Sequence, residues 1–208
     1  MVSAAKKLSS IIMYFAAMAV VLSVNDAWAQ RGGVGDIVLE PGATATLNYK
    51  MFCVQFGMPV SAGPVEFKGR SKHSAKHILA YAHSKGIIDS NPVQVQLAIW
   101  RKTTGQWKAA DHALAEDIFK KYVKFPAESE KGAVFMTDAI KAGTVKIQVM
   151  PVSPITVANP PVDWAFMGEG QLTLTNVSKR KVTVRARDGF ELAAPNQHMI
   201  GWISGSAK

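Results

Sequence analysis

The stretch TATLNYKMFCVQF, residues 44–56, decides the fold. Apolar and polar residues alternate along it, and one alternating face carries Leu47, Tyr49, Met51 and Cys53. A two-residue period sustained over this length predicts a long β-strand with one buried face. Residues 57–69, which follow, contain several glycines and prolines and are therefore expected to form a loop.

The spacing of apolar residues changes after this loop, from the two-residue period of a strand to the period of a helix. Between Ser71 and about Lys85, apolar residues recur at helical spacing, with Ala75, Ile78 and Leu79 on one stripe together with Ala82. A second apolar segment covers residues 93–100. We therefore expect residues from about 70 to 125 to form a mainly helical patch.

A third helix is expected from Asp111, a helix-capping residue type, to about Val123. Its inner stripe would hold Leu114, Ile118, Phe119 and Tyr122.

Strand patterns return in the second half of the chain, at 143–150, 171–176, 181–187, 190–193 and 199–203. The last 40 or so residues form a poor core by themselves, so their strands are expected to pack on the first strand. The predicted fold is α+β and mainly β: a β sandwich with an inserted helical patch. We divide the chain into a signal peptide (1–29), a β/α region (30–150), a proline-rich connector (151–167) and C-terminal strands (168–208).

The chain begins with features of a secretory signal peptide. Lys6 and Lys7 precede an apolar run from Ile11 to Val24, and Ala27-Trp28-Ala29 matches the small-x-small cleavage pattern. The run is shorter than the roughly 20 residues that a membrane span needs. An uncleaved N-terminal anchor is the alternative. We expect a secreted or periplasmic protein without a transmembrane segment after cleavage, and N-terminal sequencing of the native protein should begin at Gln30. A membrane-bound chain that begins at Met1 would contradict this.

The mature chain would be basic. The full chain of 208 residues has a net charge of +9, and cleavage after Ala29 removes two lysines and one aspartate, which leaves +8. The basic residues are scattered, and aromatic residues do not alternate with them as in single-strand nucleic-acid binders. A solvated surface is the prediction, with no nucleic-acid partner.

Cys53 is the only cysteine, so an intramolecular disulfide is excluded. It lies in Phe52-Cys53-Val54, and a second segment reads VQLAIW, residues 95–100, with Gln96 in its second position. These two segments resemble the paired motifs of bacterial surface thioester domains of the TQxA type, with valine in place of the usual threonine. The resemblance also extends to the order of elements, a strand followed by helices and then strands.

The resemblance implies an internal thioester in which Cys53 supplies the sulfur and Gln96 the acyl group. It also implies covalent adhesion to a protein or glycan partner, with no enzymatic turnover and no cofactor. From the residues alone, Cys53 also fits a buried structural cysteine. The alternative is an exported envelope module that binds a partner without covalent chemistry.

Other candidate sites are weaker. His73 and His77 lie four residues apart on the first predicted helix and are weak candidates for a metal site, but Lys72 and Lys76 flank them and would repel a cation. We expect no metal there. Asn176-Val177-Ser178 is a formal glycosylation sequon. No nucleophile elbow, phosphate loop or dinucleotide fingerprint occurs, so a hydrolase is the least favoured class.

Overall fold

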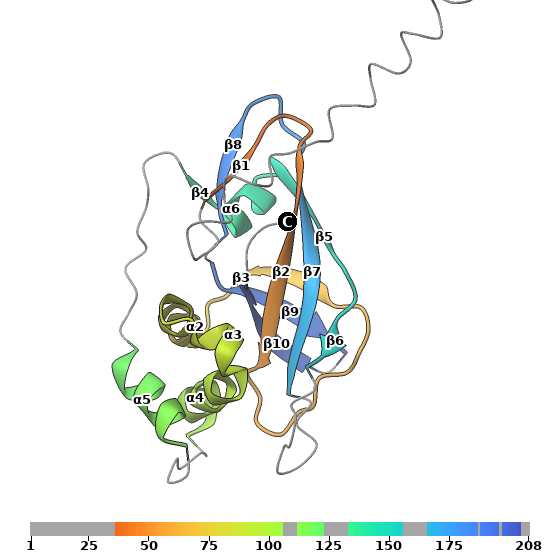
Figure 1. Ribbon diagram of the computed structural model, residues 1–208. Coiled ribbons are helices and arrows are strands. Elements are labelled where there is room, and N and C mark those ends of the chain that lie inside the picture. Colours follow the sequence, from red (N-terminus) through yellow and green to blue (C-terminus); the bar gives the residue numbers. More distant parts are fainter. Residues whose placement is uncertain are drawn as a thin grey trace, which may run out of the picture.

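The structure is a computed structural model that describes residues 36–105, 112–122, 133–155, 166–186, 188–195 and 197–204. It is an α+β, mainly β, sandwich-like fold, as predicted (Figure 1). The described strands are β1 (Asp36–Leu39), β2 (Thr44–Cys53), β3 (Glu66–Arg70), β4 (Val134–Phe135), β5 (Val145–Val149), β6 (Ser153–Pro154), β7 (Met167–Asn176), β8 (Val182–Arg185), β9 (Phe190–Ala194) and β10 (Gln197–Ile203). The described helices are α2 (Ala75–Ser84), α3 (Ile87–Ser90), α4 (Pro92–Thr104), α5 (Ala113–Lys121) and α6 (Met136–Lys141).

Strand β2 lies in the middle of a seven-stranded sheet. The strand order is β3-β9-β10-β2-β7-β5, and β6 also pairs with β7. All of these pairings are antiparallel, and β2 matches β7 from Thr44–Thr175 to Phe52–Met167. Strands from the end of the chain therefore flank the first long strand on both sides (Figure 1).

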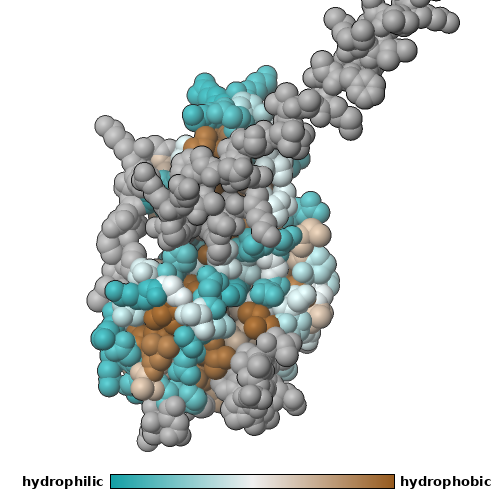
Figure 2. Space-filling view, viewed as in Figure 1, coloured by the Kyte–Doolittle hydropathy of each residue, from teal (hydrophilic) through white to brown (hydrophobic). Residues whose placement is uncertain are grey.

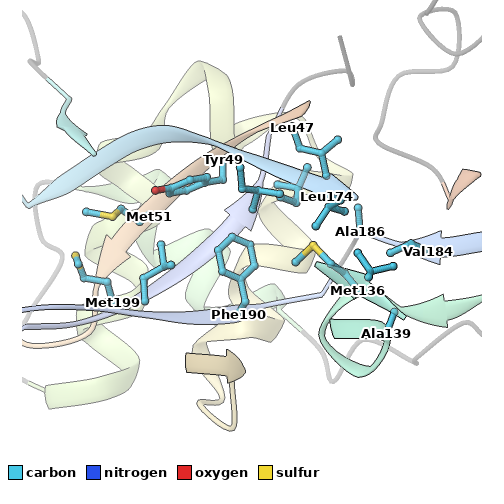
Figure 3. Close-up of a cluster of buried hydrophobic side chains, with 14 of the residues drawn as sticks. Leu47, Tyr49, Met51, Met136, Ala139, Leu174, Val184, Ala186, Phe190 and Met199 are labelled. Atoms are coloured by element: carbon cyan, nitrogen blue, oxygen red, sulfur yellow. The ribbon is translucent and has the colours of Figure 1, made fainter. Parts of the chain in front are cut away.

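One face of β2 builds the first hydrophobic core, as the alternation predicts. Leu47, Tyr49 and Met51 are fully buried in it, and Figure 3 shows them close to Phe190. The Tyr49 and Phe190 rings meet edge to face at 5.8 Å, a favourable aromatic geometry. Gly201 has no side chain where the Phe190 ring lies, so the ring can pack directly against β10.

The opposite face of the sheet packs against the helices and forms the second hydrophobic core. Phe52, Met167 and Ile200 from the sheet meet the buried stripe of α2 and the buried face of α4. The buried stripe of α2 consists of Ala75, Ile78, Leu79 and Ala82, the four residues predicted from the helical spacing of apolar residues. In Figure 2, hydrophobic residues also come to the surface in patches over this helical layer. None of the described helices is long and apolar enough to cross a membrane.

A smaller sheet of order β1-β8-β4 lies at the other end of the molecule, next to α6 (Figure 1). Buried Asp188 joins this end to the large sheet, because Arg70 Nε donates to its Oδ1 at 3.1 Å and Thr137 Oγ1 donates to its Oδ2 at 2.5 Å. Arg70 also lies over the Phe135 ring, 4.0 Å from its centroid. These contacts hold β3, α6 and the segment before β9 together.

Several local predictions were wrong or incomplete. The end of the expected loop at 57–69 is strand β3, which pairs with β9 through a bulge between Phe67 and Gly69. The first helix begins at Ala75 and not directly after Ser71, the expected cap; the Ser71 hydroxyl accepts from His73 N and donates to Glu191 Oε1. On α5 the fully buried residues are Ala115 and Ile118, and residue 111 lies outside the described part.

The short helix α6 and strand β1 were not predicted as regular elements. Both are short: among the described strands β1 pairs with β8, far along the chain, and α6 packs on the neighbouring β5 and on the distant β3. Residues 1–35, which include the predicted signal peptide, and 156–165, most of the predicted connector, lie outside the described residues.

Candidate functional site

Cys53 is the last residue of β2 and is fully buried. Its neighbour on one side is Met199 of β10. On the other side the register with β7 ends at Phe52–Met167, and the Cys53 N–H points to the carbonyl of Phe166 at 3.2 Å. The main chain of Cys53 is therefore at the point where the β2–β7 ladder ends.

Gln96 comes to this point from helix α4. The helix begins with a proline in its first turn, a position where the missing N–H costs nothing, and its residues 95–100 are all buried. Gln96 is fully buried in this run, although it is polar. A buried carboxamide needs hydrogen-bond partners, and Cys53 provides them.

The Gln96 side chain makes a two-point contact with the main chain of Cys53. Gln96 Oε1 accepts from Cys53 N at 2.9 Å, and Gln96 Nε2 donates to Cys53 O at 2.7 Å. The Cys53 N–H is therefore shared between Gln96 Oε1 and the Phe166 carbonyl, and the carboxamide lies at the end of the β2–β7 ladder. Because Oε1 and Nε2 are both bonded to Cδ, the amide carbon is held against Cys53. The structure brings together the two residues that the motifs singled out, across 43 positions of sequence.

The Cys53 thiol lies in an environment that opposes charge. Burial raises the pKa of the thiol, and a backbone hydrogen bond with Gln55 lowers it by less. The thiol itself donates to the Gln55 carbonyl oxygen at 3.0 Å, a contact that favours the protonated form. The thiolate is therefore scarce at neutral pH. An acylated sulfur carries no charge, so the same burial that opposes the thiolate tolerates a thioester.

Three aromatic rings cover this end of β2. Trp100, one turn after Gln96 on α4, is almost fully buried, and its indole N–H donates to the Gln55 carbonyl at 3.2 Å. The ring of Trp100 meets Phe56 and Phe166 edge to face, each at 4.9 Å between centroids. Phe56 is 43% exposed and forms the outer part of this cover. Both members of the Cys53–Gln96 pair are fully buried next to this cluster.

The two weak metal candidates, His73 and His77, both lie in the described part of the chain. His73 Nδ1 accepts from Ala75 N at 3.2 Å, so this ring caps the start of α2. Burial lowers the pKa of His73, and nearby Glu191 raises it by less. Across the described residues, no group of three or more His, Cys, Asp and Glu side chains is arranged to hold a metal ion.

Asn176, the first residue of the sequon, has a structural role in the turn between β7 and β8. It is fully buried, and its Nδ2 donates to the carbonyls of Leu39 at 2.9 Å and Arg180 at 2.8 Å. Its Oδ1 accepts from Ser178 N and Oγ. The amide nitrogen that a glycan would modify is thus used to hold the turn between β7 and β8.

A depression of about 560 Å³ lies on the helix-side face of β2 and β7. Its polar residues contact one another: Gln171 Nε2 donates to Asn48 Oδ1 at 3.0 Å, and Lys50 pairs with Asp89 at 2.7 Å. Neither Cys53 nor Gln96 lines it. It is lined by hydrogen-bonding and charged side chains.

Two groups at the Cys53 site had no signal in the sequence. The carbonyls of Gln55 and Phe166 take part through main-chain atoms, which every residue type carries. Trp100, in contrast, closes the VQLAIW segment and was visible there. No family model, no curated protein and no solved structure matches this chain.

Proposed function

We propose that this chain is an exported adhesion or binding protein that carries an internal thioester between Cys53 and Gln96. One observation carries the proposal: the buried Gln96 carboxamide is hydrogen-bonded to both main-chain groups of Cys53, at 2.9 and 2.7 Å. The sulfur belongs to the residue that this amide contacts, so a nucleophile and an acyl donor share one apolar site.

The bond-forming step balances without a cofactor. Cys53 Sγ attacks Gln96 Cδ, the Cδ–Nε2 bond breaks, and the thiol proton leaves with the nitrogen as ammonia. Negative charge that develops on Gln96 Oε1 faces the Cys53 N–H, which already donates to that oxygen. The aromatic cover of Phe56, Trp100 and Phe166 supports the proposal, because a thioester needs protection from water.

The stored electrophile would act on a partner. A primary amine of the partner attacks the thioester carbonyl, the C–S bond breaks, and Cys53 Sγ regains a proton. The partner is then linked to Gln96 through an amide. The adhesion role rests on the resemblance of the two segments to thioester domains, and the exported location rests on the N-terminal pattern.

The second candidate is an exported binding module without covalent chemistry. It is favoured by the hydrogen bonds of the unreacted groups, since the amide atoms of Gln96 and the Cys53 thiol all have partners. In that case Gln96 is a clamp that joins α4 to the end of β2.

Peptide mapping separates the two candidates. We expect digestion at mildly acidic pH to release one cross-linked species that joins the peptides of Cys53 and Gln96, and to yield neither peptide alone in quantity. Recovery of both peptides unlinked, with an unmodified glutamine, would favour the non-covalent module.

A further inference from the structure

The carbonyl oxygen of Gln55 accepts two hydrogen bonds from the candidate site. The Cys53 thiol reaches it at 3.0 Å, and the indole N–H of Trp100 reaches it at 3.2 Å. Gln55 lies in the turn that follows β2, where its carbonyl has left the strand ladder. The two side-chain donors thus satisfy this carbonyl.

Helix α4 supplies both the amide and the indole. Gln96 and Trp100 are four residues apart, so they lie on the same side of the helix. The amide holds the main chain of Cys53, and the indole holds the carbonyl that accepts the Cys53 thiol. Together they fix the thiol relative to the amide carbon that it would attack.

We propose that Trp100 is a positioning residue for the Cys53–Gln96 thioester, and that it acts through the Gln55 carbonyl. This inference rests on the proposed thioester. The indole holds the carbonyl in place, and the carbonyl in turn holds the thiol of the residue whose main chain the Gln96 amide contacts. Once the sulfur is acylated it has no proton to donate, and the indole is then the donor that the Gln55 carbonyl retains. The indole N–H therefore serves both the reactant and the product.

The chain offers a matched control for this role. Trp202 of β10 is also buried and belongs to the same hydrophobic core, but its Nε1 has no hydrogen-bond partner among the described residues. Trp100→Phe and Trp202→Phe both replace a buried indole by a smaller ring, yet only the first removes a hydrogen bond to the site. A general loss of packing would affect both variants.

The test follows thioester formation by intact mass in freshly synthesised protein made by cell-free translation. We expect Trp100→Phe to lose ammonia about fivefold more slowly than the wild type, the factor that corresponds to one neutral hydrogen bond. Trp202→Phe should keep the wild-type rate. Benzothienylalanine at position 100, which keeps the bicyclic shape and replaces N–H by sulfur, should reproduce the slow rate without the packing defect.

The outcomes separate the two proposals. If the wild type never loses ammonia, the thioester is absent and the role of Trp100 falls with it. If the wild type loses ammonia and the benzothienylalanine variant does so at the same rate, the thioester stands and the positioning role of the indole is wrong. Equal slowing in Trp100→Phe and Trp202→Phe would also overturn the role, because it would reflect packing alone.

Discussion

The Gln96→Ala variant is expected to lose about 3 kcal/mol of unfolding free energy through lost packing and hydrogen bonding alone, and to contain a free Cys53 thiol in every molecule. The substitution leaves a cavity beside α4 and removes Oε1, which accepts from Cys53 N; in molecules without the thioester it also removes the Nε2 donor to Cys53 O. The thioester adds to this loss, because a cross-link across a loop of this length removes about 4 kcal/mol of chain entropy from the unfolded state. Urea denaturation and thiol titration measure the two effects.

Gln94→Ala is the matched control for that variant. Gln94 lies on the same helix, undergoes the same change in size and helix propensity, and bonds to His112 and Ala115 of the α5 region instead of Cys53. It is half-buried, so we expect it to cost about 1 kcal/mol and to leave the thiol count unchanged. Equal stability losses for the two variants would contradict the special role of the Gln96 amide.

Methylamine is expected to free one Cys53 thiol per molecule and to convert Gln96 into its methylamide in the same step. Before the amine is added, thiol reagents should find nothing to react with, even in the unfolded protein. Opening the bond should also lower the melting temperature by about 10 °C, since the cross-link no longer restrains the unfolded chain. Thiol titration, peptide mass and calorimetry record the three changes.

Cys53→Ala isolates the sulfur in this experiment. It removes one small buried side chain, so the fold should survive, and its melting temperature should match that of the amine-treated wild type within a few degrees. Methylamine should have no effect on it. A wild-type thiol that titrates fully in the unfolded protein before any amine is added would count against the bond.

The parts of the fold that the sequence predicts well are those with long, regular periods. The alternation in residues 44–56 identifies β2 and its buried face, and the helical stripe from Ala75 to Ala82 identifies α2. In both elements the local pattern and the tertiary packing agree. Glu66–Arg70 shows the opposite case, because its strand depends on β9, more than a hundred residues later, and its own glycine suggests a loop.

At the candidate site, too, some features could be predicted from the sequence and others depend on distant contacts. The resemblance of two short segments singled out Cys53 and Gln96 as a hypothetical pair, but the sequence alone could not predict that they meet, because no spacing rule connects a strand end to a helix 43 positions away. Main-chain acceptors such as the Gln55 carbonyl cannot be predicted from residue type, because every residue has a main-chain carbonyl. Asn176 shows how a motif misleads, since its sequon indicates surface modification while its buried side chain holds a turn.

The intact mass of the mature native protein is the most direct test of the central claim. If the thioester is present, the wild type has the mass calculated from its sequence minus one ammonia. The Cys53→Ala variant should then have the full mass calculated from its own sequence. The full sequence mass in the wild type, together with one thiol per molecule that alkylates on unfolding, would contradict the thioester and leave Gln96 as a structural clamp on Cys53.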